Sequence, residues 1–164
     1  MRDAAIRYVA IGDSFTEGVG DEQPDGSVRN EVCPAAHRAV GLLVAQGLAD
    51  ATGRPVQYAN LAIRGRLLAP IIAEQLEPAL ALGPTLITFN GGGNDMLRPG
   101  TDMPWVLEQT EKAMRRILET DAEPLLLAGA NPTAGLPRGG AFKAKGDELT
   151  AGATVMAAGL GVRV

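Results

Sequence analysis

The segment from Tyr8 to Gly18 constrains the fold most, because an apolar run in it ends abruptly in Gly12, Asp13 and Ser14. A short apolar run that ends at a glycine is typical of a buried strand, and the residues after it lie at the carboxyl end of that strand. In an open α/β sheet this edge is where ligands bind. Ser14 is therefore a candidate nucleophile, held by a tight turn at the place where a substrate would arrive.

Strand patterns and helical patterns alternate along the rest of the chain. The expected strands cover residues 6–11, 56–61, 85–89 and 125–128, and a fifth begins at residue 161. The expected helices cover residues 34–52, 67–80, 103–120 and 143–159. Asp102 is expected to cap the third of these helices, whereas Pro78 is expected to kink or break the second.

This alternation predicts one α/β domain that spans residues 1–164. We expect a three-layer α/β/α sandwich around a flavodoxin-like, mainly parallel sheet with five strands in the order 2-1-3-4-5. In that order the loops after the first three strands lie side by side. Ser14, Gly65 and Asn94 each follow one of these strands, so we expect them to converge.

The composition restricts the possible partners and compartments. A hydrophobic content of 46% over 164 residues fits one globular core. With a formal net charge of −4 and scattered Lys and Arg, we expect no nucleic acid or anionic membrane as partner. The single cysteine, Cys33, allows no internal disulfide, and Cys and His are too few for a structural zinc site. Without an apolar run of about 18 residues, or room for a signal peptide before the first strand, the sequence favours a cytoplasmic protein.

The three converging residues suit acyl transfer, which needs a nucleophilic oxygen, hydrogen-bond donors for the developing oxyanion, and a base. Ser14 has the oxygen, and the candidate donors are the N–H groups of Ser14 and Gly65 and the side-chain amide of Asn94. A glycine suits this role because a backbone without a Cβ approaches a substrate closely. Asp13 is expected to hold the turn through hydrogen bonds, and Asp95 to cap the loop that follows.

At these residues the chain resembles the GDSL, or SGNH, hydrolase family. Three blocks carry the resemblance, each after an expected strand and in the family's order: Gly12-Asp13-Ser14-Phe15-Thr16-Glu17-Gly18, Gly65 after Asn60-Leu61, and Gly92-Gly93-Asn94-Asp95. The resemblance implies a serine esterase or lipase-like acyl hydrolase with Ser14 as nucleophile and Ser14, Gly65 and Asn94 as oxyanion donors. A small or medium acyl ester is the implied substrate, and no cofactor or metal is implied.

One block of the family pattern is missing. Members carry an Asp-x-x-His block beyond the fifth strand, in which the histidine is the base and the aspartate orients it, and the chain has no such motif. The chain is then either a fragment or truncated product, or an intact protein without the usual base. The short fifth strand favours the first alternative, because strands usually run to about five or six residues. His37, the only histidine, is expected to be a solvated helix residue, with a role as substitute base as the alternative.

A second class of function is also open, namely a non-catalytic binding module on the same scaffold. The loops of residues 14–18 and 91–94 would then hold an anion or a nucleotide phosphate through backbone N–H groups. The missing base favours this alternative, and turnover of an ester would discriminate between the two. The sequence does not fix an oligomeric state.

Overall fold

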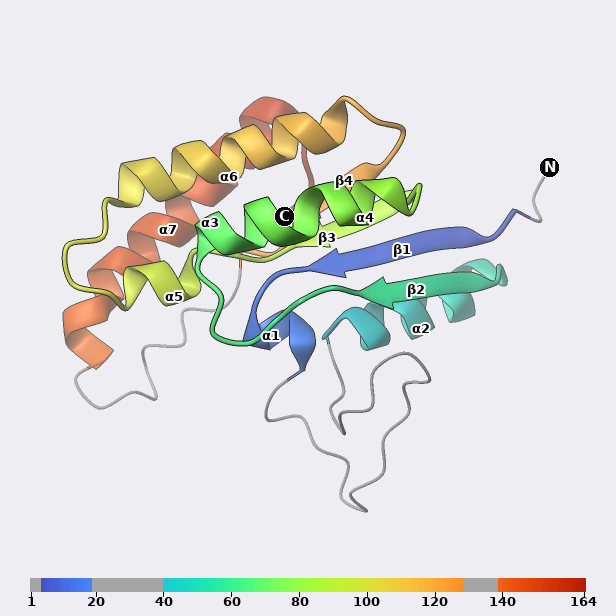
Figure 1. Cartoon of the computed structure of the whole chain (residues 1–164), viewed down its shortest axis with the longest axis horizontal. Helices are drawn as coiled ribbons and strands as arrows, with labels where there is room; N and C mark the ends of the chain where they lie inside the picture. The colour runs from blue at the N-terminus through green and yellow to red at the C-terminus, as the bar shows by residue number, and fades with distance from the viewer. Residues whose placement is uncertain (1–3, 19–39, 129–138) are drawn as a thin grey trace, which may run out of the picture.

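The computed structural model describes residues 4–18, 40–128 and 139–164 (Figure 1). Cys33 and His37 lie outside these residues, as do the first part of the helix expected from residue 34 and most of the loop after the fourth strand. The described residues form the predicted α/β fold around one parallel sheet. Its four strands have the order β2-β1-β3-β4 and are β1 (Ile6–Ile11), β2 (Val56–Asn60), β3 (Leu86–Phe89) and β4 (Glu123–Leu126).

The predicted fifth strand is present only as an isolated parallel bridge. Arg163 pairs with Leu125 of β4, and the Leu126 N–H donates to the Arg163 carbonyl oxygen at 2.9 Å. This bridge lies beside β4, which is the position that the predicted order gives to the fifth strand.

β4 begins two residues before the predicted strand, because it includes Pro124. The N–H groups of Glu123 and Leu127 donate to the carbonyls of Thr85 and Phe89, on the β3 side. Successive residues of a strand point their N–H groups to opposite sides, so the Pro124 nitrogen faces away from β3. A proline is tolerated there because no hydrogen bond to β3 is lost.

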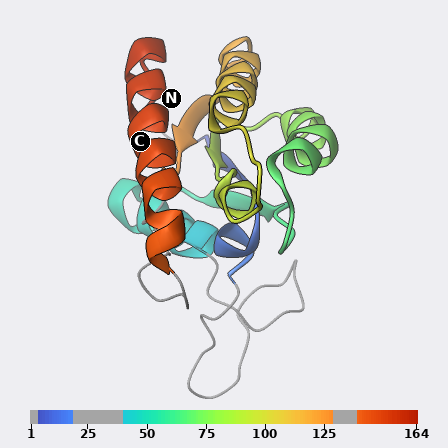
Figure 2. The same ribbon diagram turned by 90° about the vertical axis from the view of Figure 1, so that its left-hand side faces the viewer.

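Helices cover both faces of the sheet, as Figures 1 and 2 show. On one face, Ala45 of α2 (Val40–Thr52) packs with Ile6, Tyr8 and Ala10 of β1. The other face is covered by α3 (Leu68–Ile71), η1 (Ile72–Leu76), α4 (Glu77–Ala81), α6 (Met103–Leu118) and α7 (Gly139–Leu160). Two short helices, α1 (Ser14–Glu17) and α5 (Gly93–Met96), follow the carboxyl ends of β1 and β3. In the part of the chain that the structure describes, no helix has the length and apolar character needed to cross a membrane.

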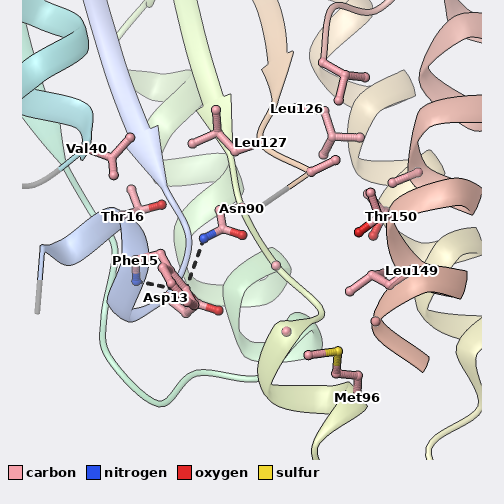
Figure 3. Close-up of a pocket in the computed structure, with 17 residues that line it drawn as sticks. Asp13, Phe15, Thr16, Val40, Asn90, Met96, Leu126, Leu127, Leu149 and Thr150 are labelled. Atoms are coloured by element: carbon pink, nitrogen blue, oxygen red, sulfur yellow. Dashed lines mark hydrogen bonds between the residues drawn. The ribbon is translucent and has the colours of Figure 1, made fainter. Parts of the chain in front are cut away.

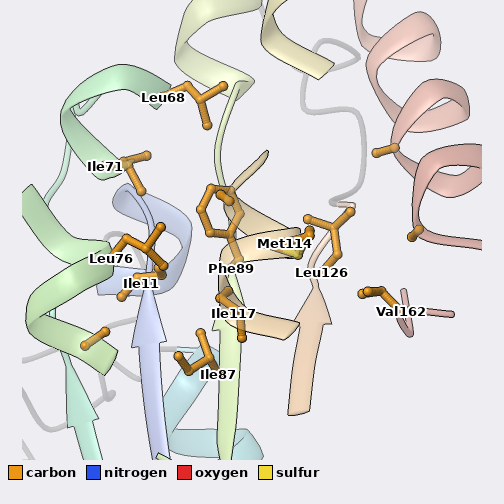
Figure 4. Close-up of a cluster of buried hydrophobic side chains, with 14 of the residues drawn as sticks. Ile11, Leu68, Ile71, Leu76, Ile87, Phe89, Met114, Ile117, Leu126 and Val162 are labelled. Atoms are coloured by element: carbon orange, nitrogen blue, oxygen red, sulfur yellow. The ribbon is translucent and has the colours of Figure 1, made fainter. Parts of the chain in front are cut away.

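The larger core lies between the sheet and this second helix layer (Figure 4). Ile11, Ile87 and Phe89 project into it from β1 and β3 and are 0% exposed. The helices contribute buried side chains that include Leu68, Ile71, Leu76, Met114 and Ile117. Burial of one such side chain contributes about 1.5–3 kcal/mol. The same packing therefore fixes the carboxyl ends of β1 and β3, where the predicted site lies.

Pro78 does not break its helix, because a π-helical turn precedes it. A proline lacks the N–H for the carbonyl four residues earlier, and its ring crowds that carbonyl. The wider turn of η1 accommodates this conflict between α3 and α4. It also turns two consecutive residues, Gln75 and Leu76, towards the sheet, where they are 2% and 4% exposed. The predicted N-cap of α6 is confirmed, since the Asp102 side chain accepts a hydrogen bond from the Trp105 N–H.

Candidate active site

Ser14 is the first residue of α1, directly after the turn that ends β1. Asp13 is the N-cap of this helix, and its Oδ1 accepts a hydrogen bond from the Phe15 N–H at 3.2 Å. At the other end, Gly18 adopts the left-handed conformation and its N–H donates to the Ser14 carbonyl oxygen at 3.0 Å. The backbone of Ser14 is therefore held from both sides.

Asn94 reaches this turn from the end of β3. Its Nδ2 donates to the Arg66 carbonyl oxygen at 2.9 Å and to Asp13 Oδ2 at 3.4 Å. Arg66 directly follows Gly65, and Asp13 directly precedes Ser14. One side-chain amide thus bridges the immediate neighbours of the other two predicted site residues. The structure brings all three loops together.

Gly65 lies in the exposed loop between β2 and α3, with φ at +74°, a conformation that favours glycine. The Arg64 guanidinium forms an ion pair with Glu17 of α1 at 3.1 Å, which attaches this loop to the helix that begins at Ser14. Within residues 4–18, 40–128 and 139–164, neither the Ser14 N–H nor the Gly65 N–H donates a hydrogen bond to another residue.

Asp13 holds the site together, as the sequence predicted. It is 1% exposed, and its two carboxylate oxygens accept hydrogen bonds from the amides of Asn90 and Asn94. Burial raises the pKa of this carboxyl group, the hydrogen bond from the Phe15 N–H opposes the rise, and the nearby charge of Asp95 adds to it. The carboxylate that orients the Asn94 amide is therefore a destabilised charge.

Asp95 has a structural role that differs from the expected cap of the loop after it, because its side chain binds the start of α3. It is 7% exposed, and its Oδ2 accepts a hydrogen bond from the Leu68 N–H at 2.9 Å. The first residue of α3 is thereby tied to the loop after β3. This contact joins the start of α3, which follows the loop of Gly65, to the third sequence block through buried atoms.

Two further residues of the site escaped the sequence analysis. Asn90 donates to Asp13 Oδ1 at 3.3 Å, and Gln75 forms hydrogen bonds with the backbone of Gly12. The signal for Gln75 is a polar residue four positions after Ile71, in the row of residues that faces the sheet. Asn90 had a signal too, since it is the first residue after the strand that leads to the glycine-rich block.

An apolar cavity of about 400 Å³ opens beside the turn (Figure 3). Asp13, Phe15 and Asn90 lie at one end of it, where the figure also shows the hydrogen bonds to the Asp13 carboxylate. Its walls come from α5, β4 and α7 and include the side chains of Met96, Leu126, Leu127, Leu149 and Ala153. Asp13, which precedes Ser14, and Asn90 thus form the polar end of a mostly apolar space.

The described residues contain no cluster of three or more His, Cys, Asp or Glu side chains that could hold a metal ion. His37, the only histidine of the chain, lies outside them. The chemistry available to this site from the described residues is consequently that of a hydroxyl group, amide donors and a buried carboxylate.

Comparison with solved structures agrees with the fold. TesA matches with 23% identity and a TM-score of 0.69, over 95% of this chain and 75% of that one. The acetylxylan esterase Axe2 from Geobacillus stearothermophilus matches with 16% identity and a TM-score of 0.74, over 99% of this chain and 76% of that one. The esterase EstA from Pseudoalteromonas sp., solved in a form inhibited by monoethylphosphonate, matches with 16% identity and a TM-score of 0.65, over 96% of this chain and 74% of that one.

Comparison by sequence identifies the family. None of the curated proteins compared matches the chain. The model of the GDSL-like lipase/acylhydrolase family, however, matches residues 10–164, which include all three sequence blocks. The chain therefore belongs to the GDSL-like lipase/acylhydrolase family.

Proposed function

We propose that the protein is an ester hydrolase that acts through an acyl-Ser14 intermediate. The observation that carries the proposal is the bridge formed by the Asn94 amide, which links Arg66 to Asp13 and so joins the loops of all three candidate residues. Membership of the GDSL-like lipase/acylhydrolase family supports hydrolysis of esters in general. The assignment of individual roles to Ser14, Gly65 and Asn94 is our proposal.

In the proposed reaction, Ser14 Oγ attacks the carbonyl carbon of the ester while a base removes the hydroxyl proton. The tetrahedral intermediate collapses, the ester C–O bond breaks, and the alcohol leaves with a proton returned by the base. Water then attacks the acyl-Ser14 ester, which releases the acid and restores the hydroxyl group. The proposal assigns the base to a group outside the described residues.

Three donors would stabilise the oxyanion in this reaction: the Ser14 N–H, the Gly65 N–H and the Asn94 amide. The first two have no other acceptor among the described residues. Asn94 uses one hydrogen in the 2.9 Å bond to Arg66, and its second faces Asp13 at 3.4 Å, a long contact that an oxyanion can replace. Loss of one such donor typically lowers the rate by about 10²–10³.

The cavity beside the turn fits the acyl portion of the substrate. It begins at residues adjacent to Ser14 and Asn94 and continues between apolar side chains of β4 and α7. Burial of methylene groups there would contribute about 0.8 kcal/mol each. We therefore propose a small or medium acyl group as the substrate portion held in this space.

A fluorophosphonate probe tests the nucleophile, because it reacts with activated serines. Ser14 and Ser27 are the two serines of the chain, so Ser27→Ala is a matched control. We expect covalent labelling of the parent and of Ser27→Ala, and none of Ser14→Ala, by mass spectrometry of the intact protein. Labelling that persists in Ser14→Ala would overturn the assignment. Binding of inorganic phosphate by an unlabelled parent would favour the non-catalytic anion-binding module.

Turnover of a p-nitrophenyl ester then tests the remaining roles. We expect Asn94→Ala to lower kcat by about 10²–10³ while the fold is retained. His37→Ala decides whether the only histidine of the chain is the base, since unchanged turnover removes it from the reaction.

A further inference from the structure

The side-chain amide of Gln75 forms hydrogen bonds with both backbone polar groups of Gly12, the N–H and the carbonyl oxygen. Gln75 Oε1 accepts a hydrogen bond from the Gly12 N–H at 2.8 Å, and Gln75 Nε2 donates to the Gly12 carbonyl oxygen at 3.0 Å. Both hydrogen bonds are buried, and the residue is 2% exposed. A glutamine amide can form this pair because its carbonyl oxygen accepts a hydrogen bond and its NH₂ group donates one.

Gly12 is the last residue before the turn. Its N–H donates only to Gln75 among the described residues, whereas its carbonyl oxygen also accepts a hydrogen bond from the Ile63 N–H at 3.2 Å. The β1 ladder with β3 ends one residue earlier, where the Asn90 N–H donates to the Ile11 carbonyl oxygen. A Cβ on Gly12 would lie 2.7 Å from the Asn90 carbonyl oxygen and 2.8 Å from Thr16 Oγ1, and its φ of +153° is rare for other residues. Gly12 is therefore anchored through its backbone, by Gln75 from the helix layer and by Ile63 from the loop after β2.

The π-helical turn explains how a helix can supply this contact. η1 turns Gln75 and Leu76 to the same side, so that one fills the core and the other reaches the strand end. π-helical turns occur frequently at functional sites. The anchored backbone continues through Asp13 into Ser14. The N–H and hydroxyl groups of Ser14 have the proposed catalytic roles.

We propose that Gln75 is a positioning residue: its amide fixes the Gly12 peptide groups and thereby the direction of Ser14 relative to the oxyanion donors. The inference rests on the proposed function, because it assigns to Gln75 an effect on the reaction of Ser14. Gln75 has no contact with the reacting atoms. Its effect is on the rate of the covalent step and not on the apolar cavity that binds the acyl group.

Substitutions at two neighbouring residues, Gln75 and Leu76, distinguish an effect on the position of Ser14 from a general effect on core packing. Gln75→Met keeps a side chain of similar length but can form neither hydrogen bond, whereas Leu76→Ala removes core volume from the same turn without touching Gly12. Both substitutions lower stability, since Gln75→Met leaves the buried Gly12 N–H unpaired and Leu76→Ala opens a cavity. Only the first is expected to change the reactivity of the folded protein.

The experiment measures fluorophosphonate labelling of Ser14 as kinact and KI, with folding checked by circular dichroism. We expect Gln75→Met to lower kinact about ten- to hundredfold with KI within about twofold, because small misplacements of reacting groups cost rates of this order. Leu76→Ala is expected to keep the parent value of kinact. Gln75→Glu keeps an acceptor for the Gly12 N–H and, when ionised, has no donor for the Gly12 carbonyl oxygen. At a pH where this side chain is ionised, its kinact is expected between those of the parent and Gln75→Met. This variant replaces Gln75→Met in the comparison if the latter does not fold.

Hydrogen exchange of the Gly12 amide, followed by NMR, adds a signature that a general loss of stability does not produce. We expect faster exchange in Gln75→Met than in Leu76→Ala at equal global stability. Equal values of kinact for Gln75→Met and the parent, with the parent labelled at Ser14, would overturn the inference alone. An unlabelled parent would instead overturn the proposed function, and with it the positioning of a nucleophile. The exchange data would still decide whether Gln75 anchors Gly12.

Discussion

The hydrogen bond between Tyr8 and Thr88 joins the two strands that lead to the site. It has a length of 2.8 Å, links β1 to β3, and both residues are 0% exposed. Tyr8→Phe removes the hydroxyl group and keeps the ring, which stacks on Tyr58 with centroids 5.1 Å apart. The Thr88 hydroxyl is then left unpaired in the interior, which costs about 1–3 kcal/mol. At about 2 kcal/mol the midpoint of thermal unfolding falls by roughly 4–8 °C for a chain of this size.

Urea unfolding followed by circular dichroism measures this effect as a shift in the midpoint at constant slope. Thr88→Val, which has nearly the same shape, is expected to cost a similar amount because it leaves the Tyr8 hydroxyl unpaired. The double variant Tyr8→Phe/Thr88→Val removes both polar groups together, so we expect it to be more stable than either single variant. Thr154→Val, on the exposed face of α7, is the control and is expected to change stability by no more than about 0.5 kcal/mol.

The double variant decides whether this reasoning holds. If its loss of stability equals the sum of the two single losses, the two hydroxyl groups do not interact and the argument from a shared buried hydrogen bond fails. A loss below about 0.5 kcal/mol for Tyr8→Phe alone would refute it as well, because such a value is typical of a solvated hydroxyl group.

Three further predictions concern titration and the turn before Ser14. Burial raises the pKa of Tyr8 to about 12, so between pH 10 and 12 the folded protein keeps the Tyr8 proton that the unfolded chain loses. The free energy of unfolding should therefore fall by up to about 3 kcal/mol over this range. Urea titrations of Tyr8→Phe should lack that decline. Because the pKa of Asp13 is raised, the free energy of unfolding should fall as the pH rises from the ordinary aspartate pKa through the raised one. Asp13→Asn should lack this decrease. Identical stability profiles against pH for the parent and Asp13→Asn would contradict the shift. Gly12→Ala should abolish labelling of Ser14 and lower the thermal midpoint, because the added Cβ meets the carbonyl oxygen of Asn90; a labelled, equally stable variant would show that the turn tolerates it.

The sequence predicted the sheet well where apolar runs end in glycine or asparagine. β1 covers the predicted residues 6–11, and β2 and β3 differ from their predictions by one residue at one end. The predicted fourth strand begins two residues later than β4. Only the hydrogen bonds of the neighbouring residues explain why Pro124 can lie inside the strand. Pro78 predicted a kink or break; the helix continues through it, and a π-helical turn replaces regular α-helix just before it.

The meeting of the three loops was predictable from the sequence, but the contacts of Asn90 and Gln75 that support it were not. Ser14, Gly65 and Asn94 could be identified from the sequence because each lies in a turn that follows an expected strand. Asn90 and Gln75 could not be assigned in the same way, because their partners are the carboxylate of Asp13 and the backbone of Gly12, which become neighbours only in the folded chain. Contacts of this kind depend on the helix phase that η1 sets, and local patterns do not determine that phase.

The parallel pairing of β1 with β3 has a consequence for folding kinetics. Tyr8 pairs with Leu86, so the strands that precede Ser14 and Asn94 meet only after a long segment of chain has closed into a loop. Such closures are slow compared with helix formation, because their entropy is lost before the contacts form. During refolding, far-ultraviolet circular dichroism should therefore recover before Ser14 becomes reactive towards a fluorophosphonate. The rate at which Ser14 becomes reactive would thus report the rate at which β1 and β3 pair in the sheet.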